Sequence, residues 1–245
     1  MKIGLRFLVI YSAVVTLAFM LTVYVGFVRP VRGASRVTDF DRIRAHRIDL
    51  VEPDGTERLI LSNRTDNPGS FFHSKEISRP DRNDSAGLLF INDEGTEDGG
   101  LIYGGLSKDG KPMSFGHLSF DQYEQDQTLA LDSSLQDGRK LSALTLNDMP
   151  DYALTPAVMA AYEKVKAMPH GPAREAAWTA VQKQYPSGNQ RASLARSPDS
   201  SVGLTLSDTA GHPRVKIAVT ANGTPQIQFL DAEGKILRTI SSATP

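Results

Sequence analysis

The sequence lacks cysteine, and neither sign of charge dominates it. No cysteine occurs among the 245 residues, which excludes disulfide bonds, thiolate metal ligands and a cysteine nucleophile. The formal net charge is -1, whereas a nucleic-acid-binding protein needs a basic surface to neutralise phosphates. We therefore expect no nucleic-acid partner. Hydrophobic residues make up 40% of the chain, which is enough for a folded core.

Common catalytic motifs are also missing. The sequence contains no HExxH, GxSxG, GxxxxGK[ST] or GxGxxG motif, and each of these has a defined role in metal, nucleophilic or nucleotide chemistry. Its histidines are scattered along the chain, at positions 46, 73, 117, 170 and 212. These absences favour a protein that is not an enzyme, and they leave catalysis by carboxylates open.

One long hydrophobic run is present, at residues 7–28, and it carries no charged side chain. As a helix it would be roughly 33 Å long, enough to cross the bilayer core of about 30 Å. The alternative is a cleaved signal peptide, whose apolar region is normally about 7 to 15 residues long. We therefore favour a single transmembrane helix at 7–28, preceded by a short tail at 1–6, with the lipid bilayer as its partner.

Charges beside this run do not decide its orientation, because basic residues lie on both sides of it: Lys2, Arg6, Arg29, Arg32 and Arg36. A short tail followed by one span and a large domain is the usual layout of a signal anchor, and long domains cross largely regardless of charge. We expect an extracytoplasmic domain on that analogy. Residues 29–46 form a basic stem, which we interpret as a solvated connection rather than a site for anionic lipid headgroups.

Residues 47–245 show the period-two pattern of β-strands. Val215, Ile217 and Val219 alternate with Lys216 and Ala218. Turn signals separate such runs at Asp54-Gly55, Glu94-Gly95, Asp109-Gly110, Asp137-Gly138, Gly211, Asn222-Gly223 and Glu233-Gly234. The pattern predicts an antiparallel meander of hairpins, with one apolar face and one polar face that is solvated.

One helical insertion interrupts this mainly β domain, at residues 155–185. Thr155 can cap a helix that starts at Pro156, and Pro172 can start a second helix after the break at 170–172. We expect the single tryptophan, Trp178, to pack the helix pair against the sheet.

Two polar stretches, residues 62–86 and 186–201, are rich in Ser, Asn, Asp, Pro and Gly and predict long loops. The first contains Phe71 and Phe72, which would be costly to expose. We expect this pair to fold back onto the sheet.

The stretch NDEGTEDGGLIYGG at residues 92–105 combines acidic side chains with glycines. Asp93, Glu94, Glu97 and Asp98 could bind a hard cation such as calcium, but their spacing does not match an EF-hand loop. A charged hairpin tip explains the same residues, because glycines permit positive φ and acids keep a sheet edge soluble. We favour the hairpin tip and keep the cation site as the alternative.

A second unusual stretch is GHLSFDQYEQDQ at residues 116–127. His117, Asp121 and Glu124 are candidate catalytic residues, because a histidine and a carboxylate can act as a general acid/base pair. The same groups could form a polar network that only rigidifies the sheet, and we favour that structural role.

Three blocks, IDLVEPDGTERLILSN, LLFINDEGTEDGGLIYGG and GHLSFDQYEQDQ, follow the hydrophobic N-terminus. With them, the chain resembles an uncharacterised bacterial family of membrane-anchored β-rich proteins over most of residues 45–240. The resemblance implies a bacterial origin and brings no known activity.

Our leading hypothesis is a membrane-anchored, non-enzymatic binding or scaffolding module without a cofactor, whose partner is an envelope glycan or a protein. It depends on the missing catalytic motifs, the long polar stretches and the anchored meander. The alternative is a hydrolase of envelope glycans that uses carboxylates of residues 93–126. The enzyme requires two of these groups in one cleft with a perturbed pKa, whereas a binding module would leave them dispersed on an open sheet face.

Overall fold

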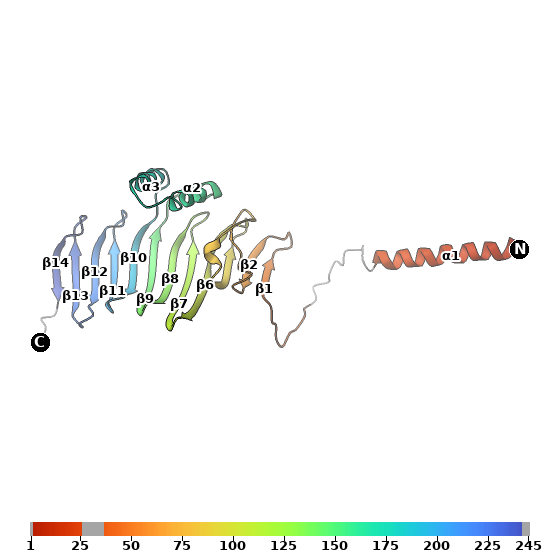
Figure 1. Cartoon of the computed structure of the whole chain (residues 1–245), viewed down its shortest axis with the longest axis horizontal. Coiled ribbons are helices and arrows are strands. Elements are labelled where there is room, and N and C mark those ends of the chain that lie inside the picture. The colour runs from red at the N-terminus through yellow and green to blue at the C-terminus, as the bar shows by residue number, and fades with distance from the viewer. Residues whose placement is uncertain (1, 26–36, 242–245) are drawn as a thin grey trace. The chain divides into compact units, whose positions relative to one another are not determined.

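The computed structural model describes residues 2–25 and 37–241, and the chain forms two units, residues 1–44 and 45–245. The first unit contains helix α1 (Lys2–Val23), which is long and apolar enough to cross a membrane (Figure 1). The helix begins before the predicted start at residue 7. Residues 26–28 of the predicted span and 29–36 of the predicted stem lie outside the described residues.

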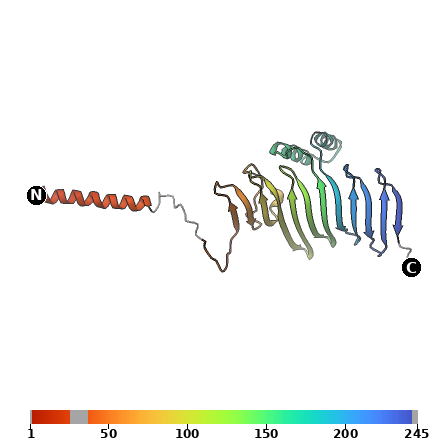
Figure 2. The same cartoon turned by 180° about the vertical axis from the view of Figure 1, so that it is seen from behind.

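The second unit is built on one antiparallel twelve-stranded sheet, as the sequence predicted. Apart from a small hairpin described below, neighbours in the chain are neighbours in the sheet, and Figures 1 and 2 show the strands side by side in one layer. In sheet order the strands are β1 (Arg47–Val51), β2 (Glu57–Ser62), β5 (Ala86–Ile91), β6 (Glu97–Lys108), β7 (Lys111–Asp121), β8 (Gln127–Gln136), β9 (Arg139–Asp148), β10 (Asn189–Arg196), β11 (Val202–Ser207), β12 (Pro213–Val219), β13 (Pro225–Leu230) and β14 (Ile236–Ser241).

Asp-Gly pairs form the tight turns at one end of the sheet. Asp109 and Gly110 join β6 to β7 with φ of 52° and 74°, and Asp137 and Gly138 join β8 to β9 with φ of 50° and 75°. A two-residue turn with both φ positive matches the twist of an antiparallel pair, and Asp-Gly is among the sequences that tolerate it best. These local signals fix the register of the four longest strands.

Helices α2 (Pro156–Lys166) and α3 (Pro172–Gln184) form the predicted insertion between β9 and β10. The hydroxyl of Thr155 accepts a hydrogen bond from the Val158 amide at 3.4 Å, as expected of an N-cap. The ring of Trp178 lies edge-on to that of Tyr162, with centroids 5.7 Å apart. Trp178 therefore packs α3 against α2, while the prediction that it packs the helix pair against the sheet stays a prediction.

Residues 186–201 are not a long loop, because β10 (Asn189–Arg196) pairs with β9 on one side and β11 on the other. Ala192 and Leu194 face one side of the sheet and Ser193 faces the other, an alternation that the surrounding polar residues obscure in the sequence. Pairing on both edges outweighs the low strand propensity of this segment.

Residues 62–86 also contain more structure than a loop. A small hairpin, β3 (Ser70–Phe72) and β4 (Lys75–Ile77), is followed by the short 3-10 helix η2 (Pro80–Arg82). Phe71 joins Ile60, Leu89 and Ile91 in the buried cluster, so this side chain folds back onto the sheet as predicted, while Phe72 is half-buried. We call residues 63–85 the covering segment.

The two faces of the sheet differ sharply in composition. Cross-strand partners on one face form an unbroken row of Leu and Ile through all twelve strands: Ile48, Leu61, Leu88, Leu101, Leu118, Leu131, Leu144, Leu194, Leu204, Ile217, Ile227 and Ile240. The next row on the same face is Leu50, Leu59, Phe90, Gly99, Phe120, Leu129, Leu146, Ala192, Leu206, Val215, Phe229 and Arg238. We call these two rows the apolar face.

The opposite face is apolar at β2 and β5, where Ile60 and Leu89 are buried. From β6 onward it carries mainly small and polar side chains, such as Gly100, Ser119, Thr145 and Ser193 in the same row. The covering segment and α2 lie over this covered face, because Phe71 and Met159 line a cavity together with Ser119. We expected the polar side to be the open one. Instead, among the described residues the covering elements lie on the polar side, and much of the apolar face is exposed.

Candidate functional site

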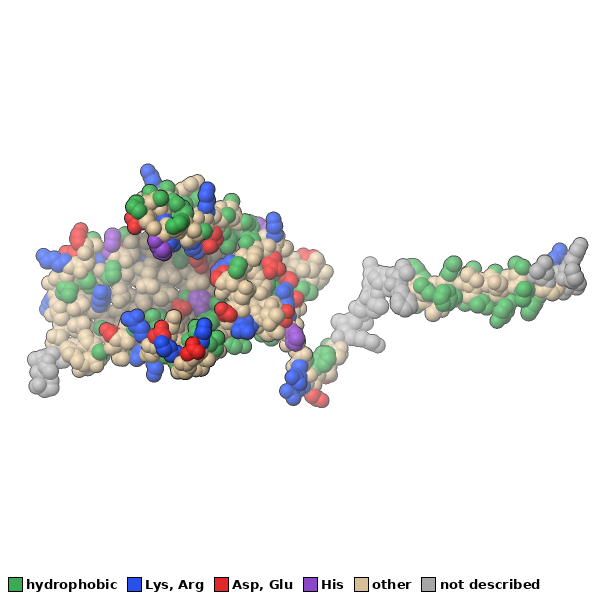
Figure 3. Space-filling model, in the orientation of Figure 1, with side chains coloured by type: hydrophobic (Ala, Val, Ile, Leu, Met, Phe, Trp, Pro, Cys, Tyr) green, Lys and Arg blue, Asp and Glu red, His purple; other side chains and the backbone are tan. Residues whose placement is uncertain are grey.

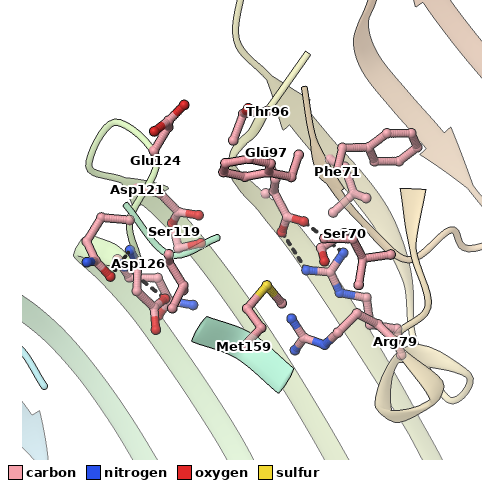
Figure 4. A pocket seen from close by; sticks show the side chains of 18 of the residues that line it. Ser70, Phe71, Arg79, Thr96, Glu97, Ser119, Asp121, Glu124, Asp126 and Met159 are labelled. Atoms are coloured by element: carbon pink, nitrogen blue, oxygen red, sulfur yellow. Dashed lines mark hydrogen bonds and ion pairs between the residues drawn. The ribbon is translucent and has the colours of Figure 1, made fainter. Parts of the chain in front are cut away.

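A cavity of ≈280 Å³ lies on the covered face, between the strands β6 and β7, the covering segment and α2. Figure 3 shows this hollow below the helices, and Figure 4 shows the side chains that line it. Its polar lining comes from Ser70, Arg79, Arg82, Glu97, His117, Ser119, Asp121, Glu124 and Asp126. A more open hollow of ≈1010 Å³ beneath α2 shares Arg79, Asp126 and Met159 with it, so the two form a continuous surface.

An ion pair joins the covering segment to the sheet at the cavity wall. Arg82 donates to Glu97 Oε1 at 2.5 Å and to Oε2 at 3.1 Å, and also to the Gly69 carbonyl at 2.9 Å (Figure 4). The side chains of Arg82 and Glu97 are only 11% and 15% exposed. Because a guanidinium can bind a carboxylate through two parallel hydrogen bonds, this contact fixes direction as well as distance.

Asp121, at the end of β7, has the most perturbed carboxyl of the cavity. Burial raises its pKa most, and the negative charges of Glu97 and Asp126 add to that effect, while Arg82 opposes them in part; together they bring the pKa to about 8. Its Oδ1 atom is buried without a hydrogen-bond partner among the described residues. At neutral pH Asp121 is therefore mostly protonated and can donate a proton or a hydrogen bond.

His117 lies on the same face of β7, but its partner is not Asp121. Its Nδ1 is 2.7 Å from Oδ1 of Asp132, directly across on β8. Because a carboxylate can only accept, Nδ1 carries the proton, and neutral His117 presents Nε2 as an acceptor. That Nε2 atom is buried and has no partner among the described residues, and the same is true of Ser70 Oγ.

The predicted metal residues of the acidic turn do not converge. Asp93 forms an ion pair with Arg58, and Glu97 is held by Arg82. Glu94 accepts a hydrogen bond from the Tyr123 hydroxyl at 2.5 Å. Burial raises the pKa of Asp98. The turn is the predicted hairpin tip between β5 and β6, and Asp93, Glu94 and Glu97 interact with three different partners.

A different group of possible metal ligands forms where three turns meet. One ligand atom each from His73, Glu94 and Glu124 lies within 4.8 Å of the others. His73 Nε2 and Glu124 Oε1 are 2.7 Å apart, and both residues have positive φ, 48° and 49°. One imidazole and two carboxylates suit a divalent transition metal better than calcium.

Close backbone packing brings these turns together. The Ser74 amide donates to the Gly95 carbonyl at 2.9 Å. A Cβ atom at Gly95 would lie only 2.1 Å from Ser74 Oγ, so a larger residue there would push the β3–β4 hairpin away. Gly95 therefore has a packing role in addition to its turn role.

Of the predicted catalytic residues, the structure places His117, Asp121 and Glu124 on one cavity, with Glu97 of the predicted metal set. The sequence analysis missed Ser70, Arg79 and Arg82. One sequence signal could have found them, because the charged run Arg79-Pro80-Asp81-Arg82 lies close in sequence to the apolar pair Phe71-Phe72. A segment that buries an aromatic side chain against the sheet brings its neighbouring charged side chains to the sheet as well.

In comparisons with known proteins, no family model and no curated protein matches the chain.

Proposed function

We propose that this protein is a membrane-anchored binding module that holds a polar, hydroxyl-rich ligand of the glycan class in the cavity of the covered face. The observation that carries the proposal is the set of three buried polar atoms without partners, Ser70 Oγ, His117 Nε2 and Asp121 Oδ1, on one cavity. A buried polar atom without a hydrogen bond costs about 1–3 kcal/mol. A ligand that pairs with these atoms recovers that cost.

The chemistry of the lining favours hydroxyl groups. Neutral His117 offers an acceptor, protonated Asp121 offers a donor, and the Ser70 hydroxyl can do both. A sugar hydroxyl also donates and accepts, so it can meet each of them. The guanidinium groups of Arg79 and Arg82 already have carboxylate partners in Asp81 and Glu97. Glu124 and Asp126 add negative charge to the lining, which disfavours an anionic ligand.

The size of the site agrees with this ligand class. A cavity of ≈280 Å³ lies just below the range of about 300–1,000 Å³ for small-molecule sites. The adjoining hollow beneath α2, with Asn147 and Tyr152 in its lining, can accommodate further sugar units of a longer chain.

Ser70→Ala should weaken saccharide binding about tenfold, because it removes one hydrogen bond of a buried site. The measurement is calorimetric titration of the full chain in detergent micelles with N-acetylglucosamine and its β-1,4-linked disaccharide. Ser133→Ala is the matched control, because Ser133 faces away from the cavity on β8, and it should bind as the unaltered chain does. Equal binding by the Ser70 and Ser133 variants, or no binding by the unaltered chain, would count against the proposal.

A second candidate, hydrolysis of envelope glycans, is favoured by the convergence of Glu97, His117 and Asp121 on one cavity, which is the arrangement that the enzyme requires. Asp121 has a pKa raised to about 8 and shares the cavity with the carboxylates of Glu97 and Asp126. A carboxylic acid that stays protonated near neutral pH beside other carboxylates is the arrangement of a general acid. Release of reducing ends from the disaccharide, lost in Asp121→Asn, would favour hydrolysis over binding alone.

We further propose that α1 stays attached as a single-pass anchor and that residues 45–245 lie outside the cytoplasm. The support is the uncharged apolar run at residues 7–28 and the short tail before it. The alternative, a cleaved signal sequence, gives a shorter chain in the mature protein.

Because the chain has no cysteine, single cysteines can report its orientation. In spheroplasts of a bacterial host, Asn222→Cys should react with a membrane-impermeant maleimide, whereas Gly4→Cys should react only after lysis. The intact mass should show residue 1 still present or trimmed by no more than the initiator methionine. Protection of Asn222→Cys in intact spheroplasts would reverse the orientation, and a mass lacking residues 1–28 would replace the anchor by a signal peptide.

A further inference from the structure

The apolar face is unusually continuous for a surface. Its first row contains only Leu and Ile across twelve strands, and its second row contains one charged residue, Arg238. Many of these side chains are accessible: Leu131 is 46% exposed, Leu194 50% and Ile217 45%. Soluble monomers rarely expose a contiguous apolar patch larger than a few hundred Å², and larger patches mark interaction sites.

The extent of this face matches a protein interface. Twelve strands at about 4.8 Å spacing make it roughly 53 Å wide. Two rows of side chains, each about 7 Å deep along the strands, give an area of roughly 700 Å². A standard stable interface buries about 800 Å² on each partner, so the area of the apolar face is close to that of one partner's side of a stable interface.

The chain's own covering elements lie on the other side. The covering segment and α2 both pack over the covered face, where the two cavities also lie. The first row of the apolar face therefore presents Leu and Ile side chains of similar length, while in the second row Gly99 and Ala192 lie among larger side chains. Side chains arranged in this way can interdigitate with those of another sheet.

We propose that a second copy of this chain packs its apolar face on this one, so that two sheets form a sandwich with the Leu and Ile rows as its core. The face is self-complementary, because nearly all its side chains are uncharged and apolar, and a two-fold dimer requires that property. Sheets in such sandwiches lie about 10 Å apart with their strands within about 30° of each other. The cavities of the covered faces stay open on the outside of the dimer.

The two-fold axis predicts which residues meet. The middle of the twelve-stranded sheet lies between β8 and β9, where Leu131 and Leu144 are cross-strand partners. An axis through this point brings Leu144 close to the same residue of the second copy. Thr145, next in the chain, points to the covered face and stays distant from its counterpart.

Cysteine cross-linking of the full chain in native membranes tests this geometry. With a short bis-maleimide cross-linker that spans the gap between the two sheets, Leu144→Cys should give a covalent dimer, whereas Thr145→Cys should remain monomeric. Absence of the dimer in Leu144→Cys, or equal cross-linking of both variants, would overturn the proposal.

Charge substitution gives an independent test. The double variant Leu194→Glu/Ile217→Glu should shift the full chain from dimer to monomer in sedimentation velocity, with its far-ultraviolet circular dichroism unchanged. Ser193→Glu/Lys216→Glu places the same charges on the same strands but on the covered face, and it should stay dimeric. A monomeric unaltered chain in which Leu144→Cys is nevertheless protected from maleimide would show that lipid or α1 covers the face, and it would overturn the dimer.

Discussion

Arg82→Ala lowers the free energy of unfolding by about 3 kcal/mol, because it leaves the Glu97 carboxylate in a poorly solvated position without its partner. The substitution also removes the hydrogen bond to the Gly69 carbonyl and with it the main polar link between the covering segment and the sheet. Urea unfolding followed by circular dichroism measures the loss.

Arg79→Ala is the matched control for this experiment. Arg79 lies in the same segment, but its partner Asp81 is 62% exposed, and a solvated ion pair contributes about 0–1 kcal/mol. Hydrogen exchange should also speed up at the amides of residues 69–77 in the Arg82 variant and not in the Arg79 variant. Equal losses in the two variants would mean that the Arg82–Glu97 pair does not hold the segment.

Asp121→Asn stabilises the protein at alkaline pH. The folded-state pKa of Asp121 is about 8, against an ordinary value of 3.8, so the folded protein holds a proton that the unfolded chain releases. Its stabilising contribution is complete below about pH 4 and is lost as pH rises to about 8. The full loss is on the order of 5 kcal/mol.

The measurement is urea unfolding from pH 4 to pH 9. The difference in stability between Asp121→Asn and the unaltered chain should grow with pH across this window and level off above pH 8. Asp121→Glu keeps a titratable group at the site, and it should retain most of the pH dependence. A difference that does not change with pH would place Asp121 in a solvated environment.

Local sequence signals were sufficient for much of the fold. Asp-Gly pairs at 109–110 and 137–138 specify turns whose backbone angles few other residues adopt. Thr155 and Pro172 mark the starts of the two helices in the same way. Each of these signals acts within a few residues, so the prediction did not require knowledge of tertiary contacts.

The features that failed depend on distant partners. Strand β10 is held by β9 and β11 rather than by its own composition. Part of the cavity could be predicted from the sequence, because His117 and Asp121 lie on the same face of one strand. The rest of its lining comes from the covering segment, which reaches the site only when Phe71 is buried.

The strand order has a consequence for how the chain folds. Outside the β3–β4 hairpin, each strand pairs only with its neighbours in the sequence, so most loops that must close are short and the contact order is low. Such a sheet behaves like a linear array, in which each new strand docks on the edge left by the previous one. The domain can therefore grow from β1 towards β14 in the order of its synthesis, without waiting for the C-terminus.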